Sequence, residues 1–103
     1  MELTKDADKL ICAMYKAYLE SRKAGADKFR ALHFTYSDIA TYKPCINWSR
    51  ADIRHTEDEL VRNGFGKRYM DGSFFANDQF IVYMENRFKN GLSELVDFLT
   101  KFI

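Results

Sequence analysis

The sequence predicts a single α+β domain in which helices predominate, and two patterns lead to that prediction. Apolar residues recur at helical spacing near both ends of the 103-residue chain. Between these segments, a helix stop at Asn63-Gly64 precedes a short apolar stretch and Asp71-Gly72, a strong signal for a β-hairpin turn. The length suits one domain, so we expect residues 1–103 to form one unit around a modest core.

A long amphipathic helix is predicted from about residue 4 to residue 23, and Gly25 is expected to end it. Its apolar positions share one broad face and are Leu3, Ala7, Leu10, Ile11, Met14, Tyr15 and Tyr18. The following stretch, residues 28–34, either prolongs a helical turn or forms a short strand at Ala31 to Phe34. We favour the strand, which would pair with the hairpin.

A helix of about two turns is predicted after Thr35, an expected N-cap with Asp38 at the capping-box position. Pro44 limits this helix, because its ring removes a backbone donor and disfavours helical geometry in the preceding residue. Ile46 and Trp48 are expected to be buried in the turn that follows, although Trp48 is also a candidate anchor for a partner protein.

The next helix is predicted over about residues 49–63. Ser49 is its expected cap, with Asp52 three residues later in a variant of the capping box. Ile53, Leu60 and Val61 recur at helical spacing, which predicts that they form the buried stripe of this helix.

Strands are expected on either side of the hairpin turn, at Phe65–Met70 and Ser73–Ala76. Asn77 is then predicted to cap a helix over residues 78–88, which Asn90-Gly91 interrupts. A strongly apolar helix closes the chain over about residues 92–103. Its stripe comprises Leu92, Leu95, Val96, Leu99, Phe102 and Ile103.

The order helix, short strand, helix, helix, hairpin, helix resembles that of winged helix-turn-helix proteins. The likeness extends over roughly residues 4–88, and the residues that carry it are Ile53, Leu60, Asn63-Gly64-Phe65 and Asp71-Gly72. The pattern is most similar to small bacterial or phage regulators of the kind related to the MarR and PadR groups. The resemblance implies a DNA-binding transcriptional regulator whose helix at 49–63 enters the major groove with its N-terminal half leading.

The resemblance also implies which residues meet double-stranded DNA. On the leading part of the recognition helix and on the wing they are Ser49, Arg50, Ala51, Arg54, His55, Lys67 and Arg68, with Lys43 in the preceding turn as a further phosphate contact. Arg50 and Arg54 are the strongest candidates, because arginine can hold two acceptors of guanine or clamp a phosphate. The alternative for each is a solvated surface residue, and Asp58 stands four residues after Arg54 at ion-pair spacing.

An acidic run at Glu57-Asp58-Glu59 departs from the family pattern, since position 57 is expected to be apolar. These charges would repel phosphates if the helix lay deep along the groove. The sequence therefore supports a second hypothesis, a winged-helix module that binds protein and no nucleic acid. Trp48, Tyr69 and the apolar C-terminal helix would then form its interface.

The net charge of +1 gives no overall attraction for nucleic acid, but the basic excess is local: residues 28–68 carry eight basic and five acidic side chains. No catalytic signature or cofactor motif is apparent, and we predict no enzyme. Cys12, His33, Cys45 and His55 lack the paired spacing of a metal site, and both cysteines are expected to be reduced and buried. The N-terminus does not resemble a signal peptide and no apolar run is long enough to span a membrane, so we expect a cytoplasmic protein.

The C-terminal helix is the expected dimerisation element, through Leu92, Leu95, Val96, Leu99 and Phe102. Such a helix packs either on its own core or on a second copy of the chain. Phe98 lies off the stripe and favours a homodimer, because packing on one side alone would leave this ring in water.

Overall fold

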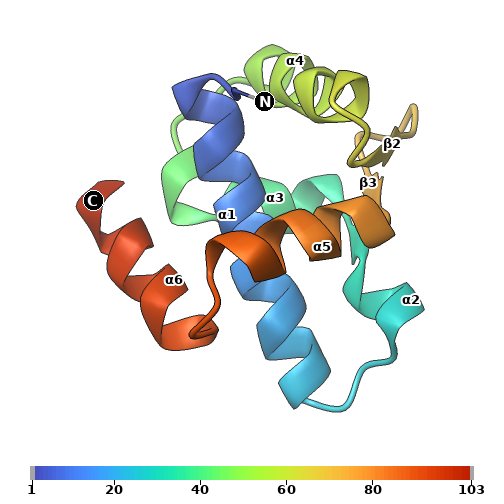
Figure 1. Cartoon of the computed structure of the whole chain (residues 1–103). Helices are drawn as coiled ribbons and strands as arrows, with labels where there is room; N and C mark the ends of the chain where they lie inside the picture. Colours follow the sequence, from blue (N-terminus) through green and yellow to red (C-terminus); the bar gives the residue numbers. More distant parts are fainter. Residues whose placement is uncertain (1, 103) are drawn as a thin grey trace.

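The computed structural model describes residues 2–102 and confirms the predicted α+β class, with helices predominant (Figure 1). In chain order the elements are α1 (Lys5–Lys23), α2 (Lys28–Ala31), β1 (His33–Phe34), α3 (Tyr36–Thr41), the 3₁₀ turn η1 (Lys43–Cys45), α4 (Arg50–Arg62), β2 (Gly66–Arg68), β3 (Phe74–Ala76), α5 (Asp78–Arg87), α6 (Leu92–Leu99) and the 3₁₀ turn η2 (Thr100–Phe102).

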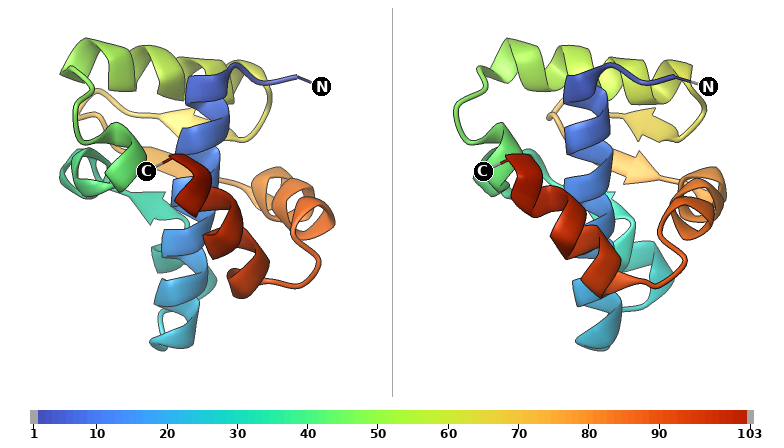
Figure 2. Two further views of the ribbon diagram at one scale, coloured as in Figure 1. Left: turned by 90° about the vertical axis from the view of Figure 1, so that its left-hand side faces the viewer. Right: turned by 60° about the vertical axis from the view of Figure 1, so that its left-hand side comes forward.

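Helix α1 runs through the middle of the molecule, with α4 across one end and α6 along its side (Figure 2). It packs against α2, η1, α4, α5 and α6. The predicted apolar face is buried, and the burial extends around the helix, with Leu10 to Tyr15 all buried. Such burial is typical of a central helix surrounded by other elements.

The helix ends form where the sequence predicts them. Thr4, Thr35, Ser49 and Asn77 each accept a hydrogen bond from the backbone N–H three residues on, at 3.1 to 3.2 Å. After α4, the Gly64 N–H donates to the Val61 carbonyl and the Phe65 N–H to the Leu60 carbonyl. These two bonds make a Schellman cap, which places Gly64 in the left-handed region at φ 84°.

A small antiparallel sheet has the strand order β1-β3-β2. His33 pairs with Phe75 on one edge of β3, and Lys67 pairs with the same residue on the other edge. The predicted pairing of the short strand with the hairpin is therefore confirmed. All three strands are shorter than predicted, because Lys28–Ala31 forms a helical turn and Tyr69 to Ser73 forms the hairpin tip.

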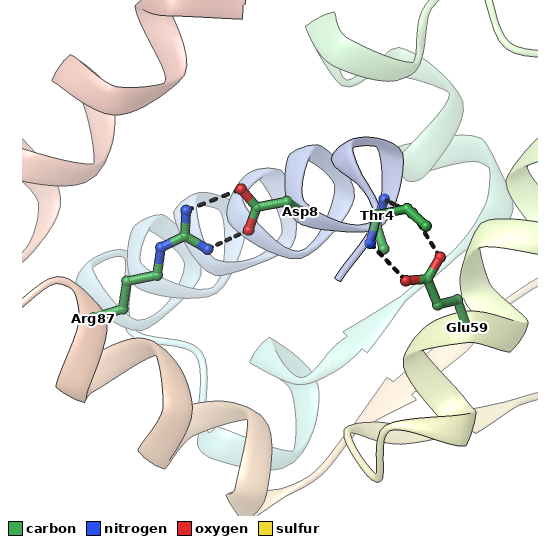
Figure 3. A network of polar contacts seen from close by, with 5 residues as sticks. Thr4, Asp8, Glu59 and Arg87 are labelled. Carbon is green, nitrogen blue, oxygen red and sulfur yellow. Dashed lines mark hydrogen bonds and ion pairs between the residues drawn. The ribbon is translucent and has the colours of Figure 1, made fainter. Parts of the chain in front are cut away.

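Two polar contacts fasten α1 to its neighbours (Figure 3). The Thr4 N–H and hydroxyl donate to the two Glu59 oxygens of α4, at 2.8 and 2.6 Å. Further along α1, Asp8 forms a bidentate ion pair with Arg87 of α5. Paired hydrogen bonds of this kind fix the orientation of two elements as well as the distance between them. These contacts therefore fix the positions of α4 and α5 relative to α1.

Some predicted core positions were wrong. Ile46 is 63% exposed, because η1 turns the chain so that Cys45 takes the inward place. Trp48 is partly buried against the core. On α4, Val61 lies at the rim, and the buried positions are Ile53, Thr56, Glu57 and Leu60. That set follows the i, i+3, i+4, i+7 spacing of one helix face, although two of its members are polar.

Both cysteines are buried free thiols, as predicted. Burial raises the pKa of Cys12 and of Cys45 to about 12, so both thiols stay protonated. No helix in residues 2–102 is long and apolar enough to cross a membrane.

Helix α6 packs on its own core. Leu95 is fully buried, and Leu92 and Leu99 pack partly against the same core. Phe98 contacts Phe88 edge-on, with ring centroids 5.6 Å apart, and the Arg87 guanidinium lies 4.7 Å from its centroid. The argument that Phe98 would be left in water is therefore wrong. The side chains of Phe102 and Ile103 lie outside the described residues, and the homodimer stays a prediction.

Substitution of Leu95 tests whether α6 belongs to the core of one chain. We expect Leu95→Ala to lower the free energy of unfolding by about 2–5 kcal/mol, since it removes a fully buried side chain. Val96→Ala, on the half-buried side of the same helix, should cost less than about 1 kcal/mol. Urea unfolding at two protein concentrations measures both. Equal losses, or a Leu95 effect that disappears on dilution, would contradict the assignment.

Candidate nucleic-acid interface

The exposed face of α4 gathers four of the residues that the sequence singled out. Arg50, Ala51, Arg54 and His55, together with Asp58, line a shallow hollow of about 430 Å³. They come together because positions one, four, five and eight residues apart lie on one side of an α-helix. The opposite side of α4 carries Ile53 and Leu60 into the core, which fixes the direction that the exposed face presents.

Arg50 is held at the start of this face. Its guanidinium carbon lies 4.2 Å from the centre of the Tyr36 ring on α3, a cation–π contact. Its Nη2 lies 3.5 Å from the carbonyl oxygen of Asp71 at the hairpin tip, the long end of a hydrogen bond. The arginine thus joins α4 to both α3 and the hairpin, and its orientation is set before any ligand arrives.

The hairpin tip is closely docked beside Arg50. The Ser73 N–H and hydroxyl donate to Asp71 Oδ1 at 2.9 and 2.6 Å, and these hydrogen bonds lower the pKa of Asp71. Gly72 follows at φ 88°, and a Cβ there would lie 3.1 Å from the Tyr36 Cβ. A side chain at residue 72 would be strained and would push the tip away from Tyr36.

Arg54 has no hydrogen bond or ion pair within the part of the chain that the structure describes. The expected partner four residues on, Asp58, is instead bound by Arg68 of β2, with Nε 2.6 Å from Oδ1. This pair joins α4 to the sheet. Its consequence is that Arg54 projects from the helix with all its donors available, whereas Arg68 is occupied.

The acidic run that weighed against a nucleic-acid interface is dispersed by the fold. Glu57 is fully buried, Asp58 pairs with Arg68, and Glu59 receives two hydrogen bonds from Thr4. The sequence interpretation treated the three carboxylates as one exposed group because they are adjacent. Helical geometry sends consecutive side chains about 100° apart, so each meets a different neighbour.

Glu57 is the main surprise of α4. Both carboxyl oxygens are buried and neither has a hydrogen-bond partner among the described residues. Loss of solvation raises the pKa of Glu57 to about 7, while the nearby Arg68 partly opposes the shift. Its neighbourhood also includes Cys45, whose thiol pKa is raised further by the Glu57 charge. Two signs of this burial were present in the sequence: the helical spacing from Ile53 and Leu60, and the apolar residue that the winged-helix pattern expects at position 57.

The remaining predicted contacts lie elsewhere. Ser49 is occupied as the α4 cap. Lys67 is exposed on β2 opposite Phe75, on the other face of the sheet from its neighbour Arg68. Lys43 lines a separate cleft beside α1 and α6. The structure therefore brings Arg50, Ala51, Arg54 and His55 together and leaves the other predicted contacts apart.

Comparison with protein-family models finds no match, and searches against curated proteins and solved structures find none either. Within residues 2–102, no group of three or more His, Cys, Asp and Glu side chains is arranged to hold a metal ion. The functional argument accordingly depends on the residues and their geometry.

The buried carboxyl predicts a pH-dependent stability. Folding raises the pKa of Glu57 from its ordinary 4.5 to about 7, so the folded chain retains a proton that the unfolded chain releases in this range. The contribution to stability is fully present below about pH 4.5 and is lost as the pH rises through about 7. Over that window it amounts to about 3 kcal/mol, taking about 1.4 kcal/mol per pKa unit.

Glu57→Gln removes the titrating group and should be more stable relative to the parent at pH 8 than at pH 5, by roughly 2–3 kcal/mol. Denaturant unfolding at both pH values measures the difference. Glu85→Gln, at an exposed position on α5, should follow the parent at each pH. A Glu57→Gln variant with the same pH dependence as the parent would show that the carboxyl is not buried.

Proposed function

We propose that this protein is a winged-helix DNA-binding transcriptional regulator, with α4 as the recognition helix and β2–β3 as the wing. The observation that carries the proposal is the exposed α4 face, where Arg50, Arg54 and His55 stand together while the carboxylates of residues 57–59 are buried or paired. The order of elements from α1 to β3, with β1 beside the hairpin, supports this assignment.

The two arginines suit different parts of a DNA contact. Arg54 has no ion pair among the described residues and projects from the helix, so it is the candidate for a bidentate contact with guanine in the major groove. Arg50 is already held by Tyr36 and the hairpin tip, so it is better suited to a fixed phosphate contact that sets the register. Their positions in the first half of α4 agree with a helix that enters the groove with its N-terminal part leading.

The wing would contribute through its tip. Tyr69 is 49% exposed and Met70 is 93% exposed. Docking of the turn against Tyr36 holds both beside the α4 face. Lys67 remains a candidate for a flanking phosphate. Two half-sites read by a homodimer would supply the area that a single small domain lacks, and the homodimer is part of the proposal.

Fluorescence anisotropy with random-sequence duplex DNA at two salt concentrations is the direct test. We expect the affinity to fall steeply with salt, with a logarithmic slope of about 0.9 for each phosphate contacted. Arg54→Ala should then weaken binding to a duplex selected from a random library by about 1–3 kcal/mol, the size of a good base contact. Lys89→Ala removes the same charge at an exposed site on the loop after α5 and should bind as the parent does.

If folded protein fails to bind duplex DNA at low salt, or if Arg54→Ala binds the selected duplex as the parent does, the recognition-helix assignment fails. A second candidate would then be favoured, a winged-helix module for protein recognition. The specific observation behind it is the exposed apolar side chains of Ile46, Tyr69 and Met70. In that case Trp48→Ala, two residues after Ile46, should disrupt the protein complex.

A further inference from the structure

A second hollow lies apart from the α4 face and shares no lining residue with it. It is a cleft of about 410 Å³ between α1, the end of α3 with η1, and the C-terminal end of α6. Figure 2 shows that the end of α6 approaches η1 across α1. The volume falls within the roughly 300–1,000 Å³ that is usual for small-molecule sites.

The cleft exists because the floor is built from small residues. Ala13 and Ala17 occupy successive turns of α1 at the place where α6 and η1 diverge, and neither side chain is large enough to fill the gap. Pro44, Val96 and Leu99 supply apolar walls. An apolar group entering here would displace water from five apolar side chains, which is the main driving force for binding in such pockets.

Some polar side chains around the cleft have a hydrogen-bond or ion-pair partner, and others do not. Lys16 and Glu20 form an ion pair at 3.0 Å, and the Thr41 and Thr100 hydroxyls donate to backbone carbonyls of their own helices. Tyr42 and Lys43 remain. Neither side chain makes a hydrogen bond or ion pair within residues 2–102, and burial raises the pKa of Tyr42, so its hydroxyl keeps its proton.

These two groups determine the ligand chemistry. A lysine ammonium is only a donor, and a protonated tyrosine hydroxyl readily donates. The unpaired groups at the cleft therefore favour a ligand that has a hydrogen-bond acceptor. A carboxylate can accept a hydrogen bond from the tyrosine and carries the negative charge that attracts the lysine. We propose that this cleft binds a small organic carboxylate with an apolar body, which packs on Ala13, Ala17 and Leu99 while its charged group meets Lys43 and Tyr42.

A ligand in this cleft would lie close to the segment that leads into α4. Lys43 and Pro44 belong to η1, and four residues separate η1 from the start of α4. A ligand in the cleft would touch the turn that sets the direction of α4. The binding proposal itself does not depend on DNA binding, and its test uses the protein alone.

Amide chemical-shift titration of the full chain tests the proposal, with cyclohexanecarboxylate as the probe and octanoate as a second probe of different shape. Cyclohexylmethanol, which has the same ring without the charge, is the matched neutral compound. We expect saturable shifts confined to amides in the three lining segments, residues 13–20, 41–44 and 96–100. Cyclohexanecarboxylate should bind more tightly than cyclohexylmethanol by roughly tenfold, the effect of one charged hydrogen bond.

Two variants separate the apolar and charged contributions. Lys43→Gln, at an exposed position, should weaken both carboxylates by roughly tenfold and leave cyclohexylmethanol unchanged. Ala17→Leu fills the floor and should weaken all three compounds, provided its amide spectrum remains that of the folded parent. Lys89→Gln serves as the charge control. The proposal is overturned if neither carboxylate gives saturable shifts, if the shifts lie outside the lining segments, or if Lys43→Gln binds both carboxylates as tightly as Lys89→Gln does.

Discussion

The fold depends on the burial of the middle of α1. Six consecutive residues, Leu10 to Tyr15, are buried, so the helix needs neighbours on most of its circumference. Those neighbours include α4 at one end, held by Glu59 and Thr4, and α5, held by Arg87 and Asp8. The α4 face and the cleft therefore share one support. The side chains of the α4 face and those of the cleft do not contact each other, but α1 positions both sets. A change in the position of α1 would therefore alter both sites.

Helix α4 shows how a nearly neutral protein can present a cationic face. The chain is almost balanced in charge, yet each of the three carboxylates at residues 57–59 is in a different environment. Glu57 is buried, Asp58 pairs with Arg68 beside the exposed face, and Glu59 accepts two hydrogen bonds from Thr4. Two of these arrangements also fasten α4 to the sheet and to α1. The third leaves a buried carboxyl with no hydrogen-bond partner among residues 2–102, which destabilises the fold. The burial of Glu57 thus keeps a negative charge off the α4 surface and lowers the stability of the fold. Such an exchange of stability for surface properties is common in proteins.

Local features of the fold were predictable from the sequence, and features set by distant contacts were not. The caps at Thr35, Ser49 and Asn77 follow from the hydrogen-bonding capacity of short polar side chains, which depends on residues within one turn. The burial of Glu57 and the packing of Phe98 depend on contacts with other elements. From its polarity Glu57 was expected to be exposed, and from its position off the apolar stripe Phe98 was expected to lie in water.

The same division applies to the candidate site. Helical spacing was enough to group Arg50 with Arg54, whereas the pairing of Asp58 with Arg68 requires knowledge of where β2 lies. The cleft was beyond sequence reasoning altogether, because its lining comes from three segments spread between residues 13 and 100.

The strand order has a consequence for how the chain assembles during synthesis. In the order β1-β3-β2 the central strand is the last of the three to be made, and Phe74 of β3 pairs with Phe34, forty positions earlier. Until β3 has left the ribosome, β1 and β2 have no strand to pair with and their edges stay open. In a growing chain the helices must therefore form before the sheet does. The pairing of β1 with β3, which closes the long loop between them, comes late. Chains arrested before and after residue 76 would reveal the step as a change in resistance to protease.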